Sequence, residues 1–210
     1  MAETHYMIDI ETLGTRPNSH ILSIGVLKFN PMGNPEAKVG DNDSIPIVWE
    51  MWDIIPKSCQ DIGLEMDADT VLWWFQQSEE ARMDVVQGLY KEKVEIRTAL
   101  VDMCSFMKNH CDGEEVYIWA KSPQFDIIIL ENAFRKSKIS TPWKFQNIFD
   151  VRTVYKMWGN RDRPDYSNVV KDRLTHNDRT MSKHNPIFDC YLQAYILSHI
   201  WKKLRLENEE

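Results

Sequence analysis

The chain has 210 residues, 43% of them hydrophobic, and a formal net charge of −7. A chain of this length can bury one sizeable core, so we expect a single domain over residues 1–210, with its core at about 5–204. The negative charge argues against a protein that coats nucleic-acid duplexes, because such binding is driven by Lys and Arg, but it allows an enzyme that holds a strand end. No apolar run reaches the roughly 20 residues of a membrane span and no signal peptide is recognisable, so we expect no membrane partner.

The first quarter of the sequence has the hydrophobic pattern of β-strands. The stretches "YMIDI" (6–10) and "ILSIGVLKF" (21–29) predict two strands, separated by the turn-rich "GTRPNSH". The stretch "IPIVWEMW" (45–52) predicts a third strand. A three-stranded meander is therefore expected to open the domain.

The rest of the chain predicts mostly helices, which gives an α/β order. The expected elements are an irregular acidic segment (about 56–68), a helical region (67–82), a helix (94–110), a strand (114–120), a helix (125–137) and a final helix (186 to about 206). For the helical region at 67–82, Asp69 or Thr70 would be the N-cap.

Two acids lie in and just after the first predicted strand, in "HYMIDIETLG". Strand residues alternate between faces, so Asp9 and Glu11 point one way while Ile8 and Ile10 point the other way. Two carboxylates side by side repel each other and resist desolvation unless a cation or a shared proton compensates. Mg²⁺ or Mn²⁺ would compensate, because both prefer oxygen ligands. The alternative is a solvated strand end, and Asp-x-Glu alone does not decide between the two.

Further acids stand at two predicted helix starts. Asp126 follows a strand and the loop "KSPQF", and strand ends of open α/β sheets are where sites are usually built. In "SKHNPIFDCYLQAY", Asn185 suits the N-cap and Pro186 suits the first helical position. Asp189 then falls in the first turns of that helix, with His184 just before it. Each also has an ordinary explanation, as a charge that stabilises a helix dipole or as a surface histidine.

Positive charge gathers in one segment. Residues 152–184 hold eight Lys and Arg against four Asp, which leaves a net charge of +4 there and −11 in the rest of the chain. This segment is a candidate phosphate-facing surface. It also has the composition of a solvated loop, and both interpretations can hold together, because loops commonly carry binding residues.

The five residues form a more specific pattern than any one of them. The chain order Asp9 and Glu11, Asp126, His184, Asp189 resembles the DEDD exonuclease superfamily in its histidine-containing branch (DEDDh), from about residue 5 to residue 200. The segments most similar to the small bacterial and phage 3′-to-5′ exonucleases akin to exodeoxyribonuclease VIII are "MIDIETLGTRP", "ILSIGVLKF", "TVLWWFQQSEEAR", "WAKSPQFDIIILENAF", "FDVRTVY" and "HNPIFDCYLQA". Relatives often carry a Gly-Asn-Gly type loop before the third acid, where this chain has "AKSPQF".

The resemblance implies an α/β fold of the ribonuclease H-like (exonuclease) type, a mixed five-stranded sheet flanked by helices. It also implies a 3′-to-5′ exonuclease that hydrolyses phosphodiester bonds by a two-metal-ion mechanism and releases nucleoside 5′-monophosphates. Two Mg²⁺ ions, for which Mn²⁺ could substitute, would be held by Asp9, Glu11, Asp126 and Asp189. His184, with a reference pKa of about 6.5, would be the general base that takes the proton from the attacking water.

By the same likeness, the Thr12 backbone amide and the Leu13 side chain would hold the 3′ nucleotide, although Leu13 could equally be a core residue. Trp73 and Trp74 suggest base stacking, which tolerates any base sequence. Adjacent helix positions face different directions, so at least one of the two is expected to be buried. We assign Trp74 to substrate binding.

The expected partner is a nucleic-acid 3′ end, with single-stranded DNA ahead of RNA. RNA remains an alternative of the same class, because the chemistry is indifferent to the sugar and no residue visibly reads a 2′-hydroxyl. An alternative of a different class is a nuclease-like module that binds nucleic acid without cutting it, and the presence of all five catalytic positions argues against it. A homodimer stays open, and we expect the cytoplasm of a bacterial or phage-infected cell as the location.

Overall fold

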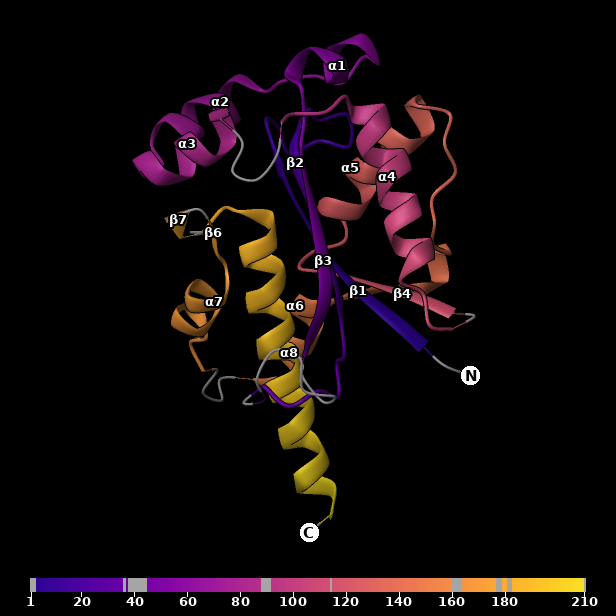
Figure 1. Ribbon diagram of the computed structural model, residues 1–210, viewed down its shortest axis with the longest axis vertical. Coiled ribbons are helices and arrows are strands. Elements are labelled where there is room, and N and C mark those ends of the chain that lie inside the picture. Colours follow the sequence, from indigo (N-terminus) through magenta and orange to yellow (C-terminus); the bar gives the residue numbers. More distant parts are fainter. Residues whose placement is uncertain are drawn as a thin grey trace.

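The computed structural model describes residues 3–35, 37, 45–87, 92–113, 115–159, 164–176, 179–180 and 183–209 (Figure 1). In chain order its elements are β1 (Glu3–Thr12), β2 (Ile21–Phe29), β3 (Pro46–Asp53), α1 (Pro56–Asp61), α2 (Ala68–Phe75), α3 (Glu79–Gln87), α4 (Ile96–Asn109), β4 (Glu115–Ala120), α5 (Asp126–Lys136), the 3₁₀ helix η1 (Phe145–Asn147), β5 (Ile148–Asp150), α6 (Val151–Trp158), α7 (Ser167–Arg173), β6 (Thr175–His176), β7 (Arg179–Thr180) and α8 (Pro186–Glu209). Within these ranges, no helix combines the length and the apolar character that crossing a membrane requires.

The main sheet has five strands in the order β3-β2-β1-β4-β5. Strands β1, β2 and β3 pair antiparallel, as the predicted meander requires, whereas β4 pairs parallel with β1 and β5 pairs parallel with β4. The sheet is therefore mixed, and the predicted fold class is confirmed. Strand β1 is the middle strand of this sheet.

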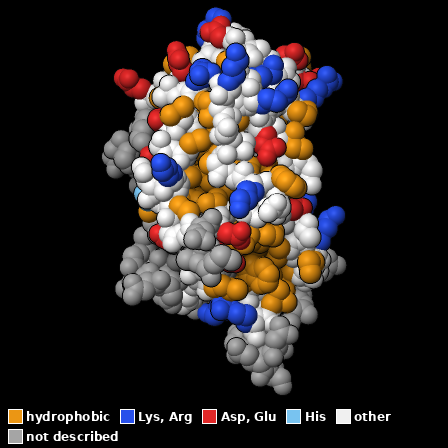
Figure 2. Space-filling model, turned by 90° about the vertical axis from the view of Figure 1, so that its right-hand side faces the viewer, with side chains coloured by type: hydrophobic (Ala, Val, Ile, Leu, Met, Phe, Trp, Pro, Cys, Tyr) orange, Lys and Arg blue, Asp and Glu red, His pale blue; other side chains and the backbone are white. Residues whose placement is uncertain are grey.

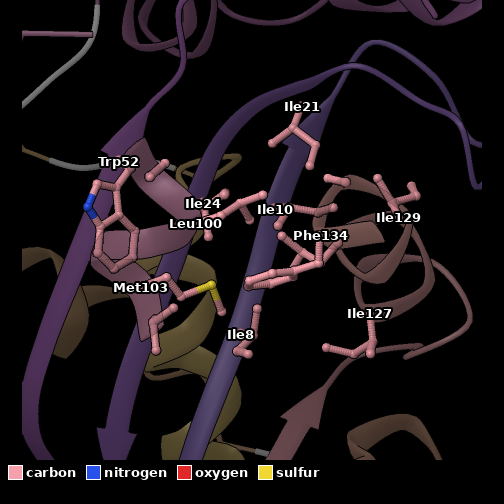
Figure 3. Close-up of a cluster of buried hydrophobic side chains, with 14 of the residues drawn as sticks. Ile8, Ile10, Ile21, Ile24, Trp52, Leu100, Met103, Ile127, Ile129 and Phe134 are labelled. Carbon is pink, nitrogen blue, oxygen red and sulfur yellow. The ribbon is translucent and has the colours of Figure 1, made fainter. Parts of the chain in front are cut away.

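Alternation along β1 divides the core into two clusters. Ile8 and Ile10 point to the face where Leu100 of α4 and Ile127 and Phe134 of α5 pack (Figure 3). Met7 points to the opposite face, in a second cluster with residues of α6, α7 and α8. Figure 1 shows the same layering, with α4 and α5 on one side of the sheet and α7 and α8 on the other. Asp9 and Glu11 share the face of Met7, because their positions differ by even steps.

Several local predictions were wrong in detail. The segment expected to be irregular contains α1, which has Pro56 at its first helical position, where a missing N–H costs nothing. Neither Asp69 nor Thr70 is the N-cap of α2. That cap is Asp67, whose Oδ1 accepts hydrogen bonds from the Asp69 and Thr70 amides, because the helix starts two or three residues earlier than those caps would place it.

The basic segment over 152–184 also holds more regular structure than predicted. It contains most of α6, all of α7 and the small β6–β7 hairpin. Helix α6 buries Val151, Tyr155 and Trp158 against the sheet. Residues 160–163, 177–178 and 181–182, with the charges Arg161, Asp162, Arg163 and Asp178, lie outside the described residues.

Candidate active site

Asp9 and Glu11 lie toward the carboxyl end of β1, opposite Gly25 and Ser23 of β2. A Cβ atom on Gly25 would come within 2.8 Å of the Pro186 carbonyl carbon. Only a glycine lets the first turn of α8 pack this closely on the sheet. The missing side chain therefore brings the start of α8 next to the acids of β1.

Asp126 is the first residue of α5, as predicted, and is 3% exposed. Its Oδ1 accepts a hydrogen bond from the Ile10 amide, at 3.3 Å. Because Ile10 lies between Asp9 and Glu11 in the sequence, this bond holds the third acid beside the first two. Strand β1 and strand β4, which precedes α5, are parallel neighbours, so their carboxyl ends meet at one edge.

The loop before Asp126 is held by a hydrogen bond to Asp150, an acid outside the predicted catalytic pattern. Ser122 has a φ of +88°, in the left-handed region that favours glycine. Its amide donates to Asp150 Oδ1 at 3.2 Å, and the same oxygen accepts from the Arg152 amide at the start of α6. A non-glycine residue in this conformation costs roughly 1 kcal/mol, so the contact with Asp150 offsets a local strain.

The start of α8 supplies the last two residues. Asn185 Oδ1 accepts hydrogen bonds from two amides in the first turn, which confirms the predicted N-cap. His184 precedes it with a φ of +72°, and the His184 amide donates to Asp189 Oδ2 at 3.3 Å. Glu11, His184 and Asp189 each offer one atom that could ligate a metal ion, and these three atoms lie within 4.8 Å of one another. All five residues of the predicted pattern are thus gathered at one place.

Burial raises the pKa of all four carboxyl groups. The pKa of Asp126 rises to about 7, mainly through loss of solvent, while the hydrogen bond from Ile10 opposes the change. The pKa values of Asp9 and Glu11 lie well above their usual range, through desolvation first and then through repulsion from the neighbouring acids. Desolvation also raises the pKa of Asp189. Four such acids cannot all be ionised unless a positive charge compensates them.

His184 is packed between the acids and two tryptophans. Its ring makes edge-to-face contacts with Trp73 and Trp74, at centroid distances of 5.3 and 6.1 Å. Burial lowers the pKa of His184, and the negative charge of Asp189 opposes that change. The imidazole is therefore neutral at neutral pH, and a neutral imidazole can accept a proton.

Cationic side chains surround the acids. Lys121, the residue after β4, and Lys183 are close enough to Asp189 to lower its pKa. Arg152 lowers the pKa of Asp126 in the same way. Two of these three cations belong to the basic segment found in the sequence, and Lys121 comes from the loop that replaces the Gly-Asn-Gly type loop of relatives. A phosphate that approached the acids would therefore meet positive charge at the rim.

A cavity of about 570 Å³ adjoins the cluster, and Glu11, Thr12 and both tryptophans line it. Trp74 is 6% exposed and its Nε1 donates to the Thr12 carbonyl oxygen at 2.8 Å, whereas Trp73 is 41% exposed. Leu13 is partly buried against Trp74 and is not among the residues that line this cavity. Substrate binding by Thr12, Leu13 and Trp74 stays a prediction.

Other lining residues include Arg16 and Phe125, which sequence reasoning did not single out. Trp73 also lines the cavity, and the sequence named it with Trp74 but did not tell which of the two rings is exposed. Arg16 lies in the turn that directly follows the first acid pair, and that position was a readable signal.

A second cavity, of about 690 Å³, lies toward the opposite end of β1. Its walls include the aromatic side chains Tyr117, Trp119, Phe149 and Trp201, together with His5. Figure 2 shows a group of apolar side chains low on the face of the molecule that it displays. None of the five residues of the catalytic pattern lines this cavity.

Solved structures of nucleases share this fold. The nuclease domain of 3′hExo, a DEDDh family member, bound to rAMP superposes with a TM-score of 0.60 at 13% identity, covering 95% of this chain and 92% of that one. E. coli exonuclease I in complex with a dT13 oligonucleotide gives 0.60 at 14% identity, and this chain spans 99% of its own length but 43% of that chain. A 3′-exonuclease that recognises the histone mRNA stem-loop gives 0.56 at 14% identity, with 95% and 82% covered.

No curated protein sequence matched the chain. A family model did, over residues 4–201, and its description is 3′-5′ exoribonuclease Rv2179c-like domain. The narrower likeness to exodeoxyribonuclease VIII stays a prediction. Because the match spans nearly the whole sequence, the chain belongs to the Rv2179c-like 3′-5′ exoribonuclease domain family, with the fold of the DEDDh exonucleases.

Proposed function

We propose that this protein is a divalent-metal-dependent 3′-to-5′ exonuclease that releases nucleoside 5′-monophosphates from the 3′ end of a single strand. The observation that carries the proposal is the convergence of four buried or half-buried carboxyls and one neutral histidine at the end of the central strand. A cavity large enough for a nucleotide adjoins that cluster.

The proposed metal ligands are Asp9, Glu11, Asp126 and Asp189. Their raised pKa values support this assignment, because crowded, desolvated carboxyls gain most from a nearby cation. The donor set is all oxygen, which suits Mg²⁺ or Mn²⁺. Two such ions would supply charge neutralisation for the phosphate and for the leaving 3′ oxygen.

His184 is the proposed general base. A ring nitrogen of the neutral imidazole takes the proton from the water that attacks the phosphorus, and contacts with Trp73 and Trp74 restrict where the ring can lie. The developing imidazolium charge is stabilised by Asp189, whose carboxylate lies in the same cluster.

The terminal nucleotide is proposed to lie in the cavity beside Glu11. Thr12, which lines this cavity, would hold it as the resemblance implies, while Trp74 fixes the Thr12 carbonyl from behind. The exposed ring of Trp73 offers a face on which a base can stack. Lys121 and Arg152 would attract the phosphates of the incoming strand.

RNA is the substrate that the family description supports, since the matched family is named for exoribonucleases. Single-stranded DNA, expected from the sequence, is the second candidate. It is supported by the likeness to exonuclease I, whose solved structure holds an oligothymidylate. The two classes differ in the 2′-hydroxyl, so a direct comparison of matched strands separates them.

The test is hydrolysis of RNA and DNA oligonucleotides of one sequence, each labelled at the 5′ end or the 3′ end, in Mg²⁺ or Mn²⁺. A 3′-to-5′ exonuclease releases labelled mononucleotide at once from the 3′-labelled strand and gives a descending ladder from the 5′-labelled one. Asp189→Asn is the matched inactive control. Failure to cut either strand with either ion would refute the proposal and favour the non-catalytic binding module.

A further inference from the structure

One polar side chain beside the acids has no place in the proposed mechanism. Gln193 lies on α8 one turn after Asp189 and is 5% exposed. Its Nε2 donates a hydrogen bond to Asp9 Oδ1, at 3.0 Å. A carboxylate can only accept, so the amide must present its nitrogen to Asp9 and its oxygen elsewhere.

The oxygen of the same amide is left without a partner. Gln193 Oε1 is buried, and no described residue donates a hydrogen bond to it. Buried amide oxygens are rarely unpaired in native proteins, and each exception calls for a reason such as a bound water or ion. The orphaned acceptor lies on the side chain that already touches an acid of the site.

The acids of the site differ in what holds them. Asp126 accepts from the backbone of β1 and Asp189 accepts from the His184 amide, so main-chain donors fix both. The donor to Asp9 is instead a side chain from the far end of the sequence. Its contribution can therefore be removed by substitution without touching the backbone.

We propose that Gln193 is a positioning residue for the metal centre, which orients Asp9 for cation binding and offers Oε1 to a water of the hydrated site. The inference rests on the proposed function. One oxygen of Asp9 is occupied by the amide, and the other is left for a cation. Removal of a hydrogen-bond partner of this kind typically lowers metal affinity or activity by about 10- to 100-fold.

The alternative is that Gln193 only fills space between α8 and the sheet. Gln193→Met separates the two, because methionine keeps the length and the packing volume but has neither the N–H donor nor the amide oxygen. Gln193→Asn is the second variant, since it keeps an amide but draws it back by one methylene. Ser198→Ala is the matched control, because Ser198 is also buried on α8 but donates to the Asn30 carbonyl oxygen, away from the acids.

The measurement is titration of Mn²⁺ into metal-free protein by calorimetry, followed by hydrolysis over a range of Mn²⁺ concentrations. We expect both Gln193 variants to bind Mn²⁺ about 10- to 100-fold more weakly than wild type, and high Mn²⁺ to restore most of their turnover. Ser198→Ala should bind Mn²⁺ like wild type. The metal-free melting temperature of Gln193→Met should not fall, since the variant also removes an unpaired acceptor.

Two results would overturn the inference. If wild type binds Mn²⁺ and hydrolyses a strand while both folded Gln193 variants bind Mn²⁺ within about twofold of it, Gln193 is only a packing residue. If wild type neither binds Mn²⁺ nor cuts either strand, the proposed function fails and the inference falls with it. The wild-type arm thus distinguishes the two failures.

Discussion

Replacing Asp126 by Asn should stabilise the metal-free protein at neutral and alkaline pH. The pKa of Asp126 is raised in the folded protein from 3.8 to about 7, and one pKa unit is about 1.4 kcal/mol, so ionising this buried acid costs the folded state up to about 4 kcal/mol. Because the folded state then binds more protons than the unfolded state, stability contributed by this group is complete below about pH 4 and is lost as the pH rises through 7. Asparagine has the same shape, keeps an oxygen for the Ile10 amide and never ionises.

The assay is thermal unfolding in EDTA at several pH values from 4 to 8. We expect the melting temperature of Asp126→Asn to match that of wild type near pH 4 and to exceed it by several degrees at pH 8, since about 1 kcal/mol corresponds to roughly 2–4 °C in a chain of this size. Asp61→Asn is the control, because Asp61 is an exposed acid paired with Lys57. If Asp126→Asn melts below wild type at pH 8, the reasoning is refuted. The ionised Asp126 carboxylate would then stabilise the folded protein instead of destabilising it.

Four further outcomes follow from the site. Hydrolysis should require Mg²⁺ or Mn²⁺, with Ca²⁺ supporting strand binding but little cleavage, because its bonds are longer and its geometry is looser; full activity in EDTA would contradict this. His184→Ala should lower turnover at neutral pH by about 10²- to 10⁴-fold in a steady-state assay, and retention of more than about a tenth of the rate would exclude it as the base. Gly25→Ala should cost about 1–3 kcal/mol in urea unfolding and reduce turnover, because the new Cβ meets the backbone of α8; an unchanged protein would mean that α8 moves freely. Trp73→Ala should raise the KM for short oligonucleotides by the equivalent of about 1–3 kcal/mol, and an unchanged KM would remove Trp73 from the substrate site.

The positions of the acids in the catalytic pattern could be predicted because they follow from local rules of strand and helix structure. The alternation of a strand places Asp9 and Glu11 on one face, and the Asn185 cap fixes where α8 begins and hence where Asp189 lies. Asp126 begins α5, as its place after a strand and a short loop indicates. Such signals act over a few residues, so a single sequence contains them.

What the sequence did not predict depends on contacts between distant segments. Helix α6 has apolar residues at helical spacing, but it is short and follows β5 with no intervening loop, so neither element stood out. The exposure of Trp73 rather than Trp74 is decided by the Thr12 carbonyl, which accepts from the Trp74 indole. The close approach of Pro186 to Gly25 likewise exists only once the last helix lies on the sheet.

The docking of α8 on β1 also sets the order in which activity can arise during synthesis. Asp9 and Gln193 are 184 positions apart, and α8 packs on β1 and β2 more than on any other element. A nascent chain that has not yet released α8 from the ribosome holds Asp9, Glu11 and Asp126 but lacks His184 and Asp189. Pairing over such a long separation is also slow to form, because closure of a long loop costs entropy before any contact repays it. The residues of the catalytic pattern thus come together only after the final helix has folded back onto the first strand.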